Sequence, residues 1–198
     1  PLSSVLGFTE LLIERNLGTK KRNKYLELIH RESNRLKNLI NDFLDIQRIE
    51  TGNQNFNFED ININKLVNEV VELYEVHDNH QYEINLPDKE IEVQADYNKI
   101  KQVVTNLVSN AVKYSDENTK IAIRVENKKE MIKIIVEDKG VGIKESEQEN
   151  LFARFYRSEN STKNQIEGTG LGLAICQKIV KAHQGEIGVK SKLEEGRS

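Results

Sequence analysis

Two glycine-rich segments constrain this chain more than any other feature of its sequence. The first reads Asp-Lys-Gly-Val-Gly over residues 138–142, and the second reads Gly-Thr-Gly-Leu-Gly-Leu-Ala over residues 168–174. Glycine adopts positive φ without strain and lets the backbone approach a phosphate closely. A helix that begins in such a loop presents unpaired N–H groups to an anion. The two segments therefore favour a nucleotide site, although a plain turn or close helix packing can also select glycine.

A predicted helix upstream of the first glycine segment supplies polar side chains for such a site. Asp96 can cap this helix, which carries Asn106, Asn110 and Lys113 at positions i, i+4 and i+7. This spacing puts two amides and a cation on one helical face. The alternative, ordinary solvated amides, does not account for a lysine in phase with them or for the glycine segments. The combination indicates nucleotide binding.

The first fifty residues have the pattern of a helical hairpin. We expect helices over residues 2–16 and 21–50, with Thr51 and Gly52 ending the second. Two apolar stripes on the second helix are wider than one partner helix would cover. They predict a four-helix bundle made by two copies of the chain, the alternative being a hairpin packed on its own C-terminal domain. The stripes contain Leu26, Ile29, Leu36, Ile40 and Phe43, and Leu28, Leu39 and Ile46.

Strand and helix patterns are mixed after Gly52. We therefore expect an α+β fold, with the helical hairpin over residues 1–52 and a two-layer α/β sandwich over residues 53–198. The polar stretch 144–167 is expected to be a mobile insertion. Expected strands lie at 56–58, 82–86, 91–95, 121–125, 131–136 and 187–189, and expected helices begin after Asn62 or Asn64, after Asp96 and at Leu171.

Composition excludes several classes of protein. Acidic and basic residues are interleaved with a net charge of −3, which gives no sign of nucleic-acid binding. No apolar run is long enough to span a bilayer, and no signal peptide is visible. Cys176 is the only cysteine, so no intramolecular disulfide can form and a reducing compartment is expected. Its apolar neighbours predict a small buried residue rather than a reactive thiol. Because the chain begins at Pro1, we expect a fragment of a longer protein.

Together these motifs resemble the transmitter region of bacterial sensor histidine kinases. Residues 106–114 resemble the N box of that family, 138–142 the G1 box, 152–157 the F box and 168–174 the G2 box. Residues 1–52 resemble its dimerisation and histidine-phosphotransfer hairpin. The resemblance implies an ATP-binding catalytic domain of the kind found in gyrase and heat-shock chaperone ATPases. It also implies a protein-histidine kinase that uses ATP in two-component signal transduction.

The resemblance assigns roles to individual residues. Asn110 is expected to ligate Mg²⁺, a cation that prefers hard oxygen ligands, and Asp138 to accept the exocyclic amine of adenine. Asn106, Lys113 and Arg157 are expected to be the catalytic residues that act on the phosphates. The expected nucleotide contacts are Asn106, Asn110, Lys113, Tyr114, Asp138, Gly140, Gly142, Ile143, Phe152, Arg157, Gly168, Thr169, Gly170, Leu171, Gly172 and Leu173.

Residues 144–169 are expected to form a lid over the nucleotide. Phe152 and Phe155 would clamp this lid to the domain, and Arg157 would reach the γ-phosphate. Arginine suits the charge of a transferring phosphoryl group. Surface solvation is the alternative for Arg154 and Arg157.

None of the histidines stands in the phosphoacceptor motif of the family. That motif ends in the Pro-Leu with which this chain begins, so the nucleophile is expected five positions upstream of Pro1. The chain is therefore expected to bind ATP without phosphorylating itself, and a last strand is expected after Gly196. The histidines expected to be structural or solvated are His30, His77, His80 and His183.

The resemblance also implies partners and a location. We expect a homodimer through residues 2–50, a response regulator or phosphorelay protein as phosphoryl acceptor, and regulatory proteins on the hairpin. No contact with nucleic acid or membrane is expected from these residues. The location implied is cytoplasmic, as part of a sensor that can be anchored in a membrane.

Three functions compete on the sequence. ATP-hydrolysing machines of the gyrase and chaperone type place a glutamate where Asn106 stands, because water needs a general base. An amide cannot take a proton, so the sequence favours transfer to an acceptor over hydrolysis. Serine kinases of the anti-sigma-factor type share the motifs but lack the apolar hairpin. A module that only binds nucleotide or dimerises remains the third alternative.

Overall fold

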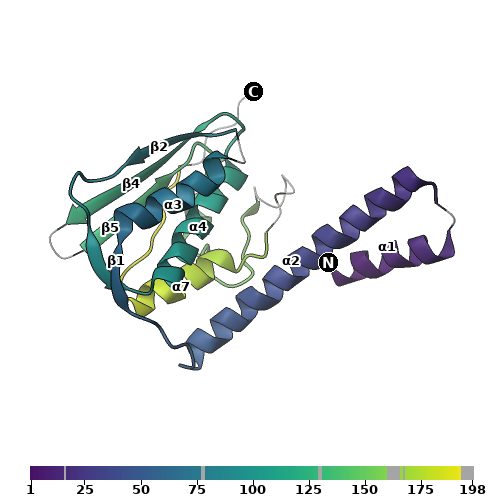
Figure 1. Cartoon of the computed structure of the whole chain (residues 1–198), viewed down its shortest axis with the longest axis horizontal. Coiled ribbons are helices and arrows are strands. Elements are labelled where there is room, and N and C mark those ends of the chain that lie inside the picture. The colour runs from purple at the N-terminus through teal and green to yellow at the C-terminus, as the bar shows by residue number, and fades with distance from the viewer. Residues whose placement is uncertain (16, 77–78, 129–130, 160–165, 167, 193–198) are drawn as a thin grey trace. The chain divides into compact units, whose positions relative to one another are not determined.

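The structure separates the chain into two compact units, Pro1–Arg48 and Ile49–Ser198 (Figure 1). Among the described helices, none combines the length and the apolar character that crossing a bilayer requires. The computed structural model describes residues 1–15, 17–76, 79–128, 131–159, 166 and 168–192.

The first unit is a helical hairpin, as the apolar stripes predict. It is formed by α1 (Leu2–Glu14) and by α2 (Thr19–Glu50), and the Phe8 ring stacks on Tyr25 with centroids 5.5 Å apart. No residue of α1 is buried. The predicted stripe on α2 is largely open to solvent in the single chain: Leu26 and Ile40 are each 48% exposed and Phe43 is 43% exposed.

The second unit contains two small sheets. In one, β1 (Glu59–Asn62) pairs antiparallel with β3 (Glu92–Ala95). In the other, β4 (Lys120–Lys128) lies between β2 (Gln81–Asn85), which is parallel to it, and β5 (Met131–Glu137), which is antiparallel. Alternate residues of β4 are buried, as the period of a strand requires. They are Ile121, Ile123 and Val125.

Three helices of this unit form one layer in the order α3, α4 and α7 (Figure 1). α3 spans Ile63–Glu75, α4 spans Tyr97–Tyr114 and α7 spans Gly172–Ala182, with the short α5 (Glu145–Gln148) before α7. The apolar faces of α3 and α4 pack on the sheets, which gives the predicted two-layer arrangement. The fully buried residues at this contact are Leu66, Val67, Val70, Val71, Val104, Val108, Ile121 and Ile123.

Side-chain caps fix where two of these helices begin. Asn62 Oδ1 accepts the Lys65 N–H at 2.9 Å, which decides between the two asparagines that the sequence offers. Asp96 Oδ1 accepts the Lys99 N–H at 3.0 Å, as predicted. The start of α4, and with it the direction of its polar face, is therefore set locally.

Two predicted strands are wrong. Residues 56–58 precede β1 without belonging to it, and the described residues 187–189 form no strand. The alternation of phenylalanines at 56–58 has another cause. The Phe56 and Phe58 rings both contact the His183 ring, with centroids 5.5 Å and 4.9 Å away. An aromatic cluster, rather than sheet pairing, accounts for the pattern.

Candidate nucleotide site

The helix α4 is held in place at both of its ends. At its start, the Asp96 N–H donates to His183 Nε2 at 3.0 Å. At its end, Ser115 forms an isolated antiparallel bridge with Gly140 of the first glycine segment. Between these points Asn106 and Asn110 are half-buried and Lys113 is exposed, all on the face that the sequence predicts.

The first glycine segment passes directly against the end of α4. A Cβ at Gly140 would lie 2.4 Å from the Tyr114 carbonyl oxygen and 2.8 Å from Asp138 Oδ1. No side chain fits there, because real Cβ atoms do not approach backbone so closely. The Gly140 N–H also donates to Asp138 Oδ1 at 2.8 Å. The segment therefore brings Asp138 and Tyr114 together at one place.

The carboxyl of Asp138 lies in a partly desolvated position although it retains contact with water. Desolvation by the surrounding protein raises the pKa of Asp138 above its ordinary value, and the Gly140 N–H opposes this in part. A carboxylate in such a position gains from a hydrogen-bond donor that arrives with a ligand. The exocyclic amine of adenine is such a donor.

Hydrogen bonds to Ser191, in the C-terminal part of the chain, hold the residues that follow the first glycine segment. Gly142 has φ of 68°, and the next residue, Ile143, donates its N–H to Ser191 Oγ at 3.0 Å. Gln148 Nε2 donates to the carbonyls of both Ile143 and Ser191, at 3.2 Å and 2.9 Å. Sequence reasoning missed Ser191, and no local pattern marks a contact between residues so far apart in the chain.

The second glycine segment leads into α7. Gly170 has φ of 71°, and a Cβ there would lie 2.8 Å from the Phe155 carbonyl carbon. Gly172, the first residue of α7, is different, because the atoms nearest to a Cβ there belong to the Asn106 side chain and lie at an ordinary contact distance of 3.7 Å. The helix begins without a side-chain cap, so its first N–H groups remain available to an anion. Asn106 thus lies beside an uncapped helix N-terminus.

The segment between the two glycine loops is organised by a buried carboxylate. Glu147 is 9% exposed, and its Oε1 accepts the Tyr156 O–H at 3.3 Å and the Glu159 N–H at 2.9 Å. Sequence reasoning missed this residue in a stretch that is polar throughout. An Arg157 guanidinium N–H donates to the Ile166 carbonyl. Residues 160–165 and 167 of the expected lid lie outside the described residues.

The expected clamp by the Phe155 ring is not what the structure shows. The side chain is 57% exposed, and the contact with the second glycine segment comes from its backbone N–H, which donates to the Gly170 carbonyl at 2.9 Å. The backbone turns at Phe155, where φ is 61°. Phe155 therefore contacts the second glycine segment through a main-chain hydrogen bond and not through its ring. Phe152 is half-buried.

Among the described histidines, His183 is bonded to main-chain groups through both of its ring nitrogens. His183 accepts from the Asp96 N–H at Nε2 and bonds the Ile179 carbonyl through Nδ1 at 2.8 Å. Because a backbone N–H can only donate, Nε2 carries no proton, and the proton of the neutral ring is on Nδ1. His30 is exposed on α2 and His80 is half-buried. His77 lies outside the described residues.

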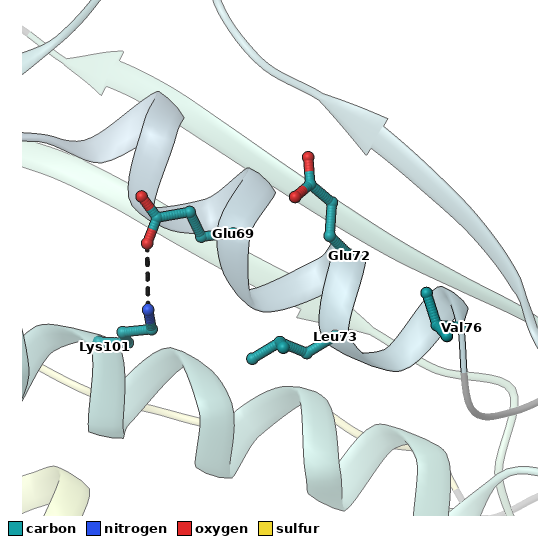
Figure 2. Close-up of a pocket in the computed structure, with 5 residues that line it drawn as sticks. All are labelled: Glu69, Glu72, Leu73, Val76 and Lys101. Atoms are coloured by element: carbon teal, nitrogen blue, oxygen red, sulfur yellow. Dashed lines mark hydrogen bonds and ion pairs between the residues drawn. The ribbon is translucent and has the colours of Figure 1, made fainter.

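An open groove of about 360 Å³ lies between α3 and α4, away from the predicted residues (Figure 2). Two of its lining side chains, Glu69 and Lys101, form an ion pair. Lys101 Nζ lies 3.0 Å from Glu69 Oε2, and the Tyr97 O–H donates to the same oxygen. The hydrogen bond from Tyr97, with that from Lys101, lowers the pKa of Glu69. Glu72, Leu73 and Val76 complete the lining. The groove is explained by packing of the two helices.

The residues around α4 and the glycine loops fit a magnesium nucleotide. Among the described residues, no group of three histidine, cysteine or acidic side chains is arranged to hold a metal ion. An amide oxygen together with phosphate oxygens and water is a sufficient set for Mg²⁺, and Asn110 can supply the amide. Gly140 lets the first glycine segment pass against Tyr114 where no Cβ would fit, and the α7 N-terminus offers N–H groups to phosphate.

Two family models match the chain. The model described as histidine kinase-, DNA gyrase B- and HSP90-like ATPase matches residues 95–198, and the His Kinase A (phospho-acceptor) domain model matches residues 1–52. The sensor histidine kinase WalK of Bacillus subtilis is 34% identical over 192 residues, which are 94% of this chain. The chain spans 31% of the length of that relative.

Solved structures of histidine kinases have a similar fold. The histidine kinase ThkA in complex with the response regulator protein TrrA has a TM-score of 0.75 and 27% identity, and the match covers 93% of this chain and 52% of that one. Full-length ShkA in complex with AMPPNP has a TM-score of 0.70 and 26% identity, and the match covers 98% of this chain and 40% of that one.

Proposed function

Because this chain belongs to the histidine kinase-, DNA gyrase B- and HSP90-like ATPases and is the transmitter region of a histidine kinase, we propose that its protein transfers the γ-phosphoryl group of ATP to a histidine of the hairpin. From there the group passes to an aspartate of a response regulator. ThkA, whose structure includes a response regulator, gives this partner its support.

One observation carries the proposal. Asn106 lies beside the uncapped N-terminus of α7, at the place where ATP-hydrolysing relatives need a general base. An amide can position a phosphate but cannot activate water by taking its proton. The site is therefore built to hold the triphosphate until a nucleophile other than water reaches it.

The residues proposed to bind the nucleotide form two groups, according to the part of the nucleotide that they contact. Asp138 and Tyr114, joined through Gly140, hold the adenine and ribose. Asn106 and Lys113, with the residues 168–173, hold the phosphates. Gly142 and Ile143 turn the chain beneath the base, and Phe152 and Arg157 close the site from the segment between the two loops.

Asn110 supplies the protein ligand of the magnesium ion. The bound ion would neutralise charge on the phosphate oxygens. Lys113 adds a point charge from the next turn of α4, and Arg157 suits the charge of the phosphoryl group in transit. The other residues of the proposed site act by positioning the nucleotide.

The transfer is an in-line displacement. A neutral imidazole nitrogen of the acceptor histidine forms a bond to the γ-phosphorus, while the bond from phosphorus to the bridging oxygen breaks and leaves ADP. The proton on the other imidazole nitrogen is lost to solvent. Of the described histidines, His183 is unsuited to be the acceptor because both of its nitrogens are engaged. We place the acceptor on the first helix of the hairpin, at the position that the family motif puts five residues upstream of Pro1.

Labelled ATP tests the proposal. A chain extended upstream of Pro1 through the expected histidine should acquire acid-labile, alkali-stable label from γ-labelled ATP. The 198-residue chain, used as the control, should bind ATP by calorimetry but stay unlabelled. Label on the control would make His30, His77, His80 or His183 the acceptor. An extended chain that binds ATP but acquires no label would contradict transfer and leave a nucleotide-binding module.

Calorimetry tests the placement of the nucleotide. Asn110→Asp should change the metal dependence of ATP binding, since a carboxylate replaces an amide beside the phosphates. Lys24→Gln on the exposed surface of α2 is a matched control and should leave binding unchanged. If the metal dependence of ATP binding is unchanged in Asn110→Asp, Asn110 is not a ligand of the metal.

A further inference from the structure

We propose that Glu147 is a positioning residue that holds Arg157 where its guanidinium meets the γ-phosphate, so that the site prefers ATP to ADP. The inference rests on the proposed function, because it concerns the phosphate end of the same site. Glu147 is a buried carboxylate on α5, and its Oε1 accepts the Tyr156 O–H at 3.3 Å and the Glu159 N–H at 2.9 Å. The two donors stand on either side of Arg157 in the chain.

The main chain is held both before and after Arg157. Before it, the Phe155 N–H donates to the Gly170 carbonyl at 2.9 Å, which joins this stretch to the second glycine segment. After it, the Glu159 N–H donates to Glu147. The first bond sets where the chain approaches Arg157, and the second restricts the direction in which the chain leaves it. Glu147 therefore adds a constraint that the glycine segment does not provide.

A second contact joins the same two parts of the chain. Lys144, the residue before α5, lies with its Nζ 2.8 Å from Glu159 Oε2. Both of these side chains are open to solvent, and ion pairs of that kind contribute little. The bonds to Glu147 are shielded from water, where hydrogen bonds are electrostatically stronger. The buried carboxylate is therefore the main support of this contact.

The second carboxylate oxygen shows that packing alone does not explain Glu147. Its Oε2 is buried and has no hydrogen-bond partner among the described residues. A buried polar atom without a partner destabilises the fold, a cost that an apolar side chain of similar size would avoid. The carboxylate supplies what an apolar side chain could not, an acceptor for the two donors beside Arg157.

The chemistry of Arg157 makes its position decisive. A guanidinium has only N–H donors, set in a rigid plane, and it binds phosphate oxygens best when that plane is aligned with them. One of these N–H groups donates to the carbonyl of Ile166, just before the second glycine segment. A displaced main chain at Arg157 would misalign the guanidinium with the γ-phosphate. ADP has no γ-phosphate, so the loss is expected for ATP alone.

Two substitutions at Glu147 separate its hydrogen bonds from its charge and its packing. Glu147→Met keeps a flexible side chain of similar length and removes both oxygens, whereas Glu147→Gln keeps one acceptor oxygen. Both remove the negative charge, so the difference between them reports the hydrogen bonds. Glu145→Gln, on the exposed surface of α5, is the matched control. Tyr156→Phe removes one of the two donors, and thermal unfolding shows whether each variant folds.

The readout is the ratio of the affinities for ATP and ADP, measured by calorimetry. Glu147→Met should lower the preference for ATP by about 3- to 10-fold, the factor for one hydrogen bond, and leave the affinity for adenosine unchanged. Glu147→Gln should keep most of the preference, Glu145→Gln all of it, and Tyr156→Phe should lose a smaller part than Glu147→Met. In an Arg157→Ala background, Glu147→Met should have no further effect.

The outcomes distinguish this inference from the proposed function. Wild-type chain that fails to bind ATP would overturn the proposed function and the inference with it. If Arg157→Ala lowers the preference for ATP but Glu147→Met does not, only the inference falls. Equal losses in Glu147→Met and Glu147→Gln would assign the effect to charge, and a loss that persists in Arg157→Ala would assign it to packing; either result overturns the inference. If Glu147→Met does not fold, Tyr156→Phe decides, and an unchanged preference for ATP in that variant overturns it.

Discussion

The hairpin and the nucleotide unit differ in how they bury apolar residues. In the nucleotide unit, α3 and α4 each present a row of fully buried valines to the sheets. In the hairpin, α1 buries nothing and Ile46 is the buried residue of α2. Burial of apolar surface is the main force that stabilises a fold. The nucleotide unit therefore holds a core of its own, whereas the apolar stripe of the hairpin predicts that a second copy completes its core.

The largest expected effect comes from placing charge in the hairpin stripe. Leu36→Glu combined with Ile40→Glu should abolish a dimer formed through residues 2–50, because two carboxylates would be buried at the interface. ATP binding should remain, since these residues lie in the other unit. Sedimentation measures the mass, and Asn38→Glu on the exposed surface of α2 is the control. A wild-type chain that is monomeric at micromolar concentration would contradict the predicted bundle.

A smaller effect is expected from a methyl group inside the nucleotide unit. Gly170→Ala should destabilise this unit by about 1–2 kcal/mol or more, because alanine disfavours positive φ and its Cβ would overlap the Phe155 backbone. Gly172→Ala meets only ordinary contacts and should leave stability nearly unchanged. Denaturant unfolding compares the two. Equal stability of both variants would show that the loop is not held as described.

Asp138→Asn should weaken ATP by roughly 1–3 kcal/mol, the range for losing one partner of a partly buried hydrogen bond. The amide presents N–H groups as well as an oxygen to the adenine amine, while its oxygen can still accept the Gly140 N–H. Calorimetry with ATP measures the change. Glu137→Gln, at the end of β5, is a neighbouring control. If both variants lose the same ATP affinity, the cause would be the removal of a negative charge in general and not the loss of adenine recognition.

The smallest expected effect concerns pH. Because the pKa of Asp138 is raised in the folded chain, the folded state favours the protonated carboxyl. Its contribution to stability is complete below the ordinary carboxyl pKa and is lost as pH rises through the raised value. Asp138→Asn should therefore be slightly more stable than wild type at neutral pH and lose this advantage in acid. Unfolding temperatures across this range measure the difference, and a constant difference would contradict the assigned cause.

Local patterns predicted most of the elements and failed where distant contacts decide. The cap at Asp96 and the alternation at Ile121, Ile123 and Val125 act within a few residues, so α4 and β4 could be predicted. The strand expected at 56–58 could not be told from an aromatic cluster, because its partner is His183.

The candidate site was also predicted where local patterns decide and missed where distant contacts decide. Motif spacing predicted Asn106 on the polar face of α4 and Gly172 at the start of α7, and the structure brings these two together. The ties from Ser191 and Glu147 have no sequence signal, because each depends on a backbone N–H whose position only the folded chain determines.

β2 and β4 are parallel, so the chain must cross over between them, and that crossover contains α4. Pairing Gln81 with Lys120 closes a long loop, which is an entropically costly step in folding. The pairing of β2 with β4 cannot form until α4 has packed on the sheet. We therefore expect the packing of the apolar face of this helix to affect the folding rate. Its polar face takes no part in that closure. Substitutions there can change what the unit binds while leaving the speed of folding as it was.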